Sequence, residues 1–206
     1  MRNCKFTLVE LLMVIGIIAI LAGILLPVIN GAAKKADMTK AKAEITTLLN
    51  AIKQFESTYG VLPLPDGYTE GDPIDATLDS NKNSEYLELI KVLQAELPAG
   101  GGAYYSTNPN TRATRFLDVV GNIAGEFNDP WGNNYNIIFD ENYDGKISTI
   151  PATLSNSVHI EADLFFSVVI WSEGANPNNT VSGIKDNIYS FPVAWDKNNN
   201  QYNITR

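Results

Sequence analysis

The stretch Phe6–Ile29, FTLVELLMVIGIIAILAGILLPVI, decides how the rest of the chain is arranged. Its only charged residue is Glu10, and no charge follows from Leu11 to Ile29. A helix formed here is apolar on every side, so it leaves no face for water. The uncharged run is also long enough to cross a hydrocarbon core of roughly 30 Å. We therefore expect a helix that lies in lipid or is buried inside a protein assembly.

Two residues distinguish this run from an ordinary membrane anchor. An ionised Glu10 in hydrocarbon costs several kcal/mol unless it finds a partner, although it could also lie at the level of the headgroups. Pro27 removes one backbone donor and bends the helix. The short leader Met1–Lys5 contains two basic residues and is expected on the cytoplasmic side, with the chain after the run across the membrane.

From Phe6 to Pro27 the sequence resembles the N-terminus of type IV pilins and type II secretion pseudopilins. The resemblance implies that a prepilin peptidase cuts between Lys5 and Phe6 and methylates the new N-terminus. Glu10 and Pro27 stand in register with the family's acid and proline, whereas Lys5 replaces its usual glycine. The amine of Phe6 on a neighbouring subunit would supply the cation that a buried Glu10 needs.

The same resemblance implies a structural filament subunit and not an enzyme. Such a subunit is stored in the bacterial inner membrane by a single pass, with its C-terminal head periplasmic or extracellular. Its partners would be other copies of the chain, the prepilin peptidase, an inner-membrane assembly platform and, before assembly, membrane lipid. The alternative from another class is a membrane-anchored binding module for a glycan or a protein.

Composition argues against several other functions. The chain has 206 residues and a net charge of −8 without a basic patch, so nucleic acid is an unsuitable partner. Cys4 and His159 are the only residues of their kinds, which leaves little for transition-metal binding or for a Ser-His-Asp site. Glu161 and Asp163 form a carboxylate pair, but no apolar pocket is indicated around them for glycoside hydrolysis.

The sequence predicts four consecutive parts: a leader (1–5), a transmembrane and assembly helix (6–29), an amphipathic half of the same helix (30–59) and a globular head (60–206). The amphipathic half carries an apolar seam with helical spacing, which covers the head or, alternatively, pairs in a coiled coil. The seam consists of Met38, Ala41, Ile45, Leu48, Ile52, Phe55 and Tyr59. Gly60 should end the helix.

The head is predicted to be α+β. A short helix is expected over 85–97, followed by a flexible linker at Gly100–Gly102. Runs rich in β-branched and aromatic residues predict strands at 114–120, 135–139, 164–171 and 187–193. A small antiparallel sheet of these strands would be covered by the apolar seam, giving a pilin-like fold. The turn that begins at Asp129, DPWGNNY, is similar to a turn of major pseudopilins, and we expect an aromatic residue to fix it.

Two loops are candidate calcium sites. In the first, Asp140, Asn142 and Asp144 alternate before Gly145, and the Lys146 carbonyl would be the next ligand. The twelfth position of this loop is Pro151, so the usual bidentate carboxylate is missing unless Glu161 or Asp163 replaces it through space. A hairpin loop without metal remains the alternative.

The second loop runs from Trp171 and is similar to the C-terminal loop of major pseudopilins. The resemblance implies calcium bound by acidic side chains and backbone carbonyls. Asp186 matches the later acid, Asn176 stands where the family commonly has Asp, and Glu173 could compensate for it. A bare loop is equally compatible with this sequence.

Overall fold

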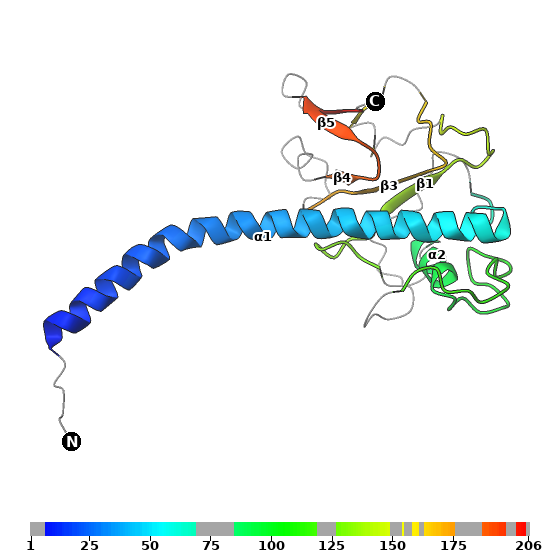
Figure 1. Cartoon of the computed structure of the whole chain (residues 1–206). Helices are drawn as coiled ribbons and strands as arrows, with labels where there is room; N and C mark the ends of the chain where they lie inside the picture. Colours follow the sequence, from blue (N-terminus) through cyan, green and yellow to red (C-terminus); the bar gives the residue numbers. More distant parts are fainter. Residues whose placement is uncertain are drawn as a thin grey trace. The chain divides into compact units, whose positions relative to one another are not determined.

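The computed structural model describes residues 7–68, 85–118, 127–148, 154, 158–160, 163–175, 187–196 and 201–204. The chain divides into two compact units, Met1–Thr39 and Lys40–Arg206. One helix, α1 (Leu8–Tyr59), contributes to both units, and the other described elements belong to the second (Figure 1). The expected α+β class is confirmed, with a long N-terminal helix followed by short strands.

The helix α1 ends at Tyr59, as the sequence predicts. Gly60 follows with a φ of 74° and donates its N–H to the Glu56 carbonyl at 2.7 Å. This left-handed residue is the usual glycine cap at the end of a helix. The predicted seam is buried, with Met38 and Tyr59 half-buried at its two ends. The seam residues that are at most 1% exposed are Ala41, Ile45, Leu48, Ile52 and Phe55.

The second helix, α2 (Glu85–Leu93), ends before the predicted position at Leu97. Ala95 adopts a left-handed φ of 61°, and the N–H of Glu96 bonds to the Lys91 carbonyl at 2.8 Å. This is the bond of a Schellman cap, which normally has glycine at the left-handed position. Because alanine occupies that position here, the sequence pattern did not indicate the end of the helix.

The first sheet is antiparallel, with strands in the order β1 (Asn136–Phe139), β3 (Val168–Ser172) and β4 (Ile188–Tyr189). Every residue of β1 and β3 is buried, so both faces of these strands are covered. Figure 1 shows β1 and β3 beside α1, and the Tyr135 hydroxyl, just before β1, donates to Glu44 Oε2 on α1 at 2.7 Å. The predicted packing of the helix on a small antiparallel sheet is confirmed.

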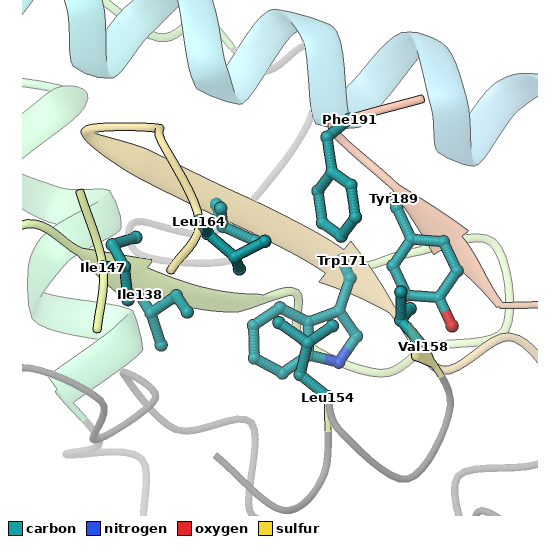
Figure 2. Close-up of a cluster of buried hydrophobic side chains, with 9 residues drawn as sticks. Ile138, Ile147, Leu154, Val158, Leu164, Trp171, Tyr189 and Phe191 are labelled. Carbon is teal, nitrogen blue, oxygen red and sulfur yellow. The ribbon is translucent and has the colours of Figure 1, made fainter. Parts of the chain in front are cut away.

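A second sheet was not predicted. It has the order β2 (Val158–His159), β6 (Gln201–Ile204), β5 (Val193–Asp196), with a parallel pair between β2 and β6 and an antiparallel pair between β5 and β6. Side chains of both sheets meet in one hydrophobic cluster, which Figure 2 shows around Trp171 of β3. The cluster contains Ile138, Ile147, Leu154, Val158, Leu164, Val169, Trp171, Tyr189 and Phe191.

The strand predicted at 114–120 is wrong for its described part, residues 114–118. The N–H groups of Phe116 and Leu117 both donate to the Leu93 carbonyl at the end of α2, at 2.9 and 3.0 Å. Residues 119–120 lie outside the described part. The segment therefore caps a helix instead of joining a sheet, because its backbone donors serve a carbonyl that the helix leaves free.

The same segment is held by the amide of Asn110, which is 2% exposed. Its Nδ2 donates to the carbonyls of Val92 and Thr114 at 2.7 and 2.8 Å. Its Oδ1 accepts the hydroxyl of Tyr59 at 2.6 Å and the N–H of Thr114 at 3.0 Å. One buried side chain thus joins the end of α1, the end of α2 and the loop between α2 and β1.

The flexible linker predicted at Gly100–Gly102 is also wrong. The buried Glu88 carboxylate of α2 accepts the N–H groups of Ala103 and Tyr104 at 2.7 and 2.8 Å. A methyl group added at Gly102 would overlap this carboxylate. Gly102 therefore allows a close approach of the backbone to a buried carboxylate, which is a different use of glycine from flexibility.

Candidate functional site

The start of α1 carries a capping box formed by Thr7 and Glu10. The N–H and hydroxyl of Thr7 donate to Glu10 Oε2 at 2.8 and 2.7 Å, and Thr7 Oγ1 accepts the Glu10 N–H at 3.3 Å. These reciprocal bonds satisfy backbone donors that the first turn of a helix leaves free. The sequence indicates a role for Glu10, whereas the role of Thr7 was not predicted, although the T-x-x-E spacing before an apolar run was the available signal.

The other predicted processing and assembly residues are only partly described. Lys5 and Phe6 lie outside the described residues. The backbone at Pro27 belongs to α1, which continues through it, but its side chain lies outside the described part. The roles assigned to Lys5, Phe6 and Pro27 therefore stay predictions.

The N-terminal part of α1 exposes apolar side chains on all of its faces, since residues 7–24 are all exposed. This segment has no polar face opposite an apolar one, and this distinguishes it from a surface helix of a globular protein. Large side chains more than half exposed are Leu8, Val9, Leu11, Leu12, Met13, Ile15, Ile18, Ile20, Leu21 and Ile24. Within the described residues, no helix has both the length and the apolar character needed to cross a membrane.

The loop after β1 brings together the predicted ligands of the first calcium site. The Asp140 carboxylate accepts the Gly145 N–H on Oδ2 at 2.8 Å. Asn142 Oδ1 accepts the Asp144 N–H at 2.8 Å, and Asp144 Oδ1 accepts the Lys146 N–H at 3.1 Å. Three oxygen-bearing side chains are thus fixed along one turn of the chain.

Asp163, which was considered as a further ligand, is paired with a cation of the same loop. Lys146 Nζ lies 2.6 Å from Asp163 Oδ2. The hydrogen bond from this ammonium group holds the pKa of the Asp163 carboxyl below its ordinary value. Pro151 and Glu161 lie outside the described residues.

The second predicted calcium loop is described only at its start. Glu173 is half-buried there, whereas Asn176 and Asp186 lie outside the described residues. Calcium at this loop stays a prediction. In the part of the chain that is described, no three His, Cys, Asp or Glu side chains come together to hold a metal ion.

The carboxylate of Asp129 fixes the turn that begins there, a role that the sequence did not indicate. Asp129 Oδ1 accepts the N–H groups of Trp131 and Asn133 at 3.0 and 2.8 Å. Ser172 at the end of β3 donates its hydroxyl to Asp129 Oδ2 at 2.6 Å and accepts the Gly174 N–H at 3.0 Å. Burial raises the pKa of Asp129, while these hydrogen bonds act in the opposite direction. The turn therefore positions the start of the second loop, and Ser172 could not be identified from the sequence because its partner lies on another element.

Comparison with known proteins gives three curated relatives. The chain is 47% identical over 62 residues to the type IV wide pilus major component PilA4 of Thermus thermophilus, a match that covers 30% of this chain and 44% of PilA4. It is 30% identical over 118 residues to the type II secretion system core protein G of Vibrio cholerae, covering 57% of this chain and 78% of that protein. It is 25% identical over 163 residues to core protein G of Aeromonas hydrophila, covering 79% of this chain and 91% of that protein.

The match therefore spans less than half of the Thermus pilus protein but most of both secretion proteins. No family model and no solved structure matches the chain.

Proposed function

Because the chain belongs to the pilin-like family of the type II secretion system core protein G, we propose that it is a structural subunit of a type IV pilus-like or type II secretion pseudopilus filament. Its main partners are then other copies of itself. The relatives are named as components of a pilus and of a secretion system, which supports a structural role without catalysis.

The observation that carries the proposal is the exposed apolar surface of α1 between Leu8 and Ile24. A continuous exposed apolar surface of this kind, along a helix of more than ten residues, marks a surface that another molecule covers. Each Å² of this surface left in water outside the membrane would cost about 25 cal/mol, so a subunit that leaves the lipid needs the same segment of other copies to cover it. A filament core of N-terminal helices would cover every side of the segment.

Before assembly, we place the chain in the bacterial inner membrane with a single pass and with the head, residues 60–206, on the periplasmic or extracellular side. The uncharged run from Leu11 to Ile29 and the basic residues of the leader support this placement. Membrane lipid would cover the apolar surface until other copies replace it during extraction by an inner-membrane assembly platform.

Processing by a prepilin peptidase between Lys5 and Phe6 belongs to the same proposal. The Thr7 cap supports it, because α1 begins at Leu8 and the bond to be cut then precedes the first helical residue. Mass spectrometry of the protein recovered from cells should find a chain that starts with methylated Phe6. A chain that keeps Met1–Lys5 and occurs only as a lipid-bound monomer would instead indicate an anchored binding module.

The capping box allows two roles of Glu10 to be separated. A glutamine at this position retains an acceptor for Thr7 but has no charge, whereas Thr7→Val removes the hydroxyl and keeps the carboxylate. If the charge pairs with the amine of Phe6 on a neighbouring subunit, Glu10→Gln should lower the filament yield at least about tenfold. Thr7→Val should stay within about threefold of the wild type, because a helix cap contributes only on the order of 1 kcal/mol.

Filaments sheared from cells would be quantified against total protein for both variants, and membrane fractions would show whether insertion is retained. Asp118→Asn serves as a control, since this acid is 80% exposed on the second unit. A normal filament yield for Glu10→Gln would contradict the proposed charge pair. A loss in Thr7→Val alone would assign Glu10 to the cap only.

A further inference from the structure

One oxygen of the Asp140 carboxylate is buried without a hydrogen-bond donor. Asp140 directly follows β1, and only 2% of it is exposed. Its Oδ2 accepts the Gly145 N–H, which places the carboxylate inside the turn formed by residues 140–146. Its Oδ1 has no hydrogen-bond partner within the part of the chain that the structure describes. A buried polar atom in this state costs free energy, and a cation bound there would offset the cost.

The same turn presents further oxygens at alternate positions. The side chains of Asn142 and Asp144 are each held by a bond to the N–H two residues later. Tyr143 and Gly145 have φ values of 57° and 84°, so the backbone turns sharply between these ligands. Alternating oxygen side chains in a turn with glycine at the sixth position are characteristic of calcium loops, whose seventh residue contributes its carbonyl. Lys146 occupies that seventh position.

The turn is fixed at both ends and in its middle before any ion binds. Its first N–H donates to the Ser167 carbonyl at 3.0 Å. At its other end, Ile147 and Leu164 exchange two backbone bonds of 2.7 and 3.0 Å, and both side chains belong to the buried cluster in Figure 2. The Tyr143 hydroxyl accepts the Leu62 N–H at 2.8 Å. Little conformational entropy is then lost when an ion binds.

Charge and ligand type indicate which ion fits. The ammonium group of Lys146 is paired with Asp163, so its repulsion of a cation in the turn is reduced. All of the available ligands are oxygens, which suit a hard cation and not a transition metal. Only two carboxylates, Asp140 and Asp144, contribute charge, so the affinity should be near the weak end for calcium, with a Kd on the order of 10⁻⁴ M.

We propose that residues Asp140–Lys146 form a calcium site on the second unit, with the side chains of Asp140, Asn142 and Asp144 and the carbonyl of Lys146 as ligands. Its place between β1 and Ile147 means that calcium would tighten the connection between β1 and the backbone bridge of Ile147 with Leu164. The site is separate from the N-terminal segment that carries the filament proposal. Either proposal can therefore fail without the other.

The test is a calorimetric titration of CaCl₂ into the purified full chain in detergent, with MgCl₂ in a parallel titration. Calcium should bind with a Kd on the order of 10⁻⁴ M and magnesium more weakly, because magnesium demands a smaller octahedral site. Asp144→Asn keeps the Oδ1 that bonds to Lys146 but removes the charge, and should weaken calcium binding at least about tenfold. Asp144 is exposed, so this variant should fold normally.

Glu141→Gln is the matched control, because it removes the same charge one position from a ligand, and its affinity should stay within about twofold of the wild type. Asp186→Asn tests the second loop and should leave the Asp144-dependent binding in place. The proposal would be overturned if the wild type bound no calcium at about 10 mM, or if Asp144→Asn bound it as tightly as the wild type. Binding that is lost in Asp186→Asn and kept in Asp144→Asn would assign the ion to the second loop and also overturn it.

Discussion

Two parts of α1 have the same helical backbone but differ in what covers their side chains. Ile18 in the N-terminal part is 58% exposed, whereas Ile52 in the second unit is fully buried. The first part has apolar residues on all sides, and the other has a single seam that packs within its own chain. The helix therefore combines an apolar seam that the chain itself buries with an apolar surface that only other molecules can cover.

Two carboxylates of α1, one in each part of the helix, also differ in whether they bond within the helix or to another part of the chain. Glu44 accepts a hydrogen bond from the buried Tyr135, which directly precedes β1, so it connects α1 to the sheet. Glu10 bonds to Thr7, only three residues earlier. An acid near the N-terminus thus contributes to the helix itself, whereas the acid in the second unit contributes to the tertiary fold.

The largest expected effect comes from the same substitution made in both parts. Ile52→Ala should lower the free energy of unfolding of the second unit by about 2–5 kcal/mol, because it leaves a cavity in the core. Ile18→Ala should change it by less than about 0.5 kcal/mol in dispersed protein, because this side chain is exposed. Urea denaturation of both variants in detergent measures the difference. Equal losses would show that the N-terminal part is also packed within its own chain.

A second pair of substitutions tests whether the glycine segment 100–102 is packed against α2 within the second unit. Gly102→Ala should cost about 2–4 kcal/mol, because the added methyl group displaces the Glu88 carboxylate from its two N–H donors. Gly100→Ala has open space around the new methyl group and should cost less than about 0.5 kcal/mol. Thermal unfolding compares the two variants, and a flexible glycine linker would make both neutral.

The bond between α1 and the sheet should have an intermediate effect. Tyr135→Phe removes the hydroxyl that donates to Glu44, and we expect a loss of about 1–2 kcal/mol because this hydroxyl is buried. Thr7→Val removes the corresponding bond of Glu10 and should leave the unfolding of the second unit unchanged. Denaturation curves of the two variants give both values. A comparable loss in Thr7→Val would remove the distinction between the two acids.

The smallest expected effect is a gain in stability at the end of α2. Ala95→Gly should stabilise the second unit by up to about 1 kcal/mol, because its φ of 61° suits glycine better than alanine. Ala99→Gly provides the comparison at a residue without positive φ, and it should be neutral or slightly destabilising. The midpoint of urea denaturation resolves these shifts. A loss of stability in Ala95→Gly would contradict the role of this cap.

Features with a clear local pattern could be predicted from the sequence. The seam of α1 follows helical spacing, Gly60 marks the end of the helix, and β1 combines aromatic and β-branched residues. The alternating oxygens of the turn after β1 were equally visible, because their bonds join residues two to five positions apart. Such features depend on near neighbours in the chain, which a single sequence displays directly.

The features that were missed depend on distant partners. The two-residue strand β2 exists through its parallel pairing with β6, and no local pattern can indicate that contact. The close approach at Gly102 depends on Glu88, which belongs to the preceding helix. The pairing of Asp163 with Lys146 likewise joins residues on two segments. In each case the spatial partner, and not the residue type, gives the position its role.

The most direct test of the filament proposal is the reactivity of a cysteine at position 18, introduced as Ile18→Cys with Cys4→Ser to remove the native thiol. A membrane-permeable maleimide should label it in detergent-dispersed subunits, where detergent and not protein covers position 18, and at least about tenfold more slowly in sheared filaments, where other copies would cover it. Ser57→Cys, at an exposed position of α1 in the second unit, provides the control for general accessibility. Equal labelling of position 18 in dispersed subunits and in filaments would contradict the claim that this surface forms the filament core.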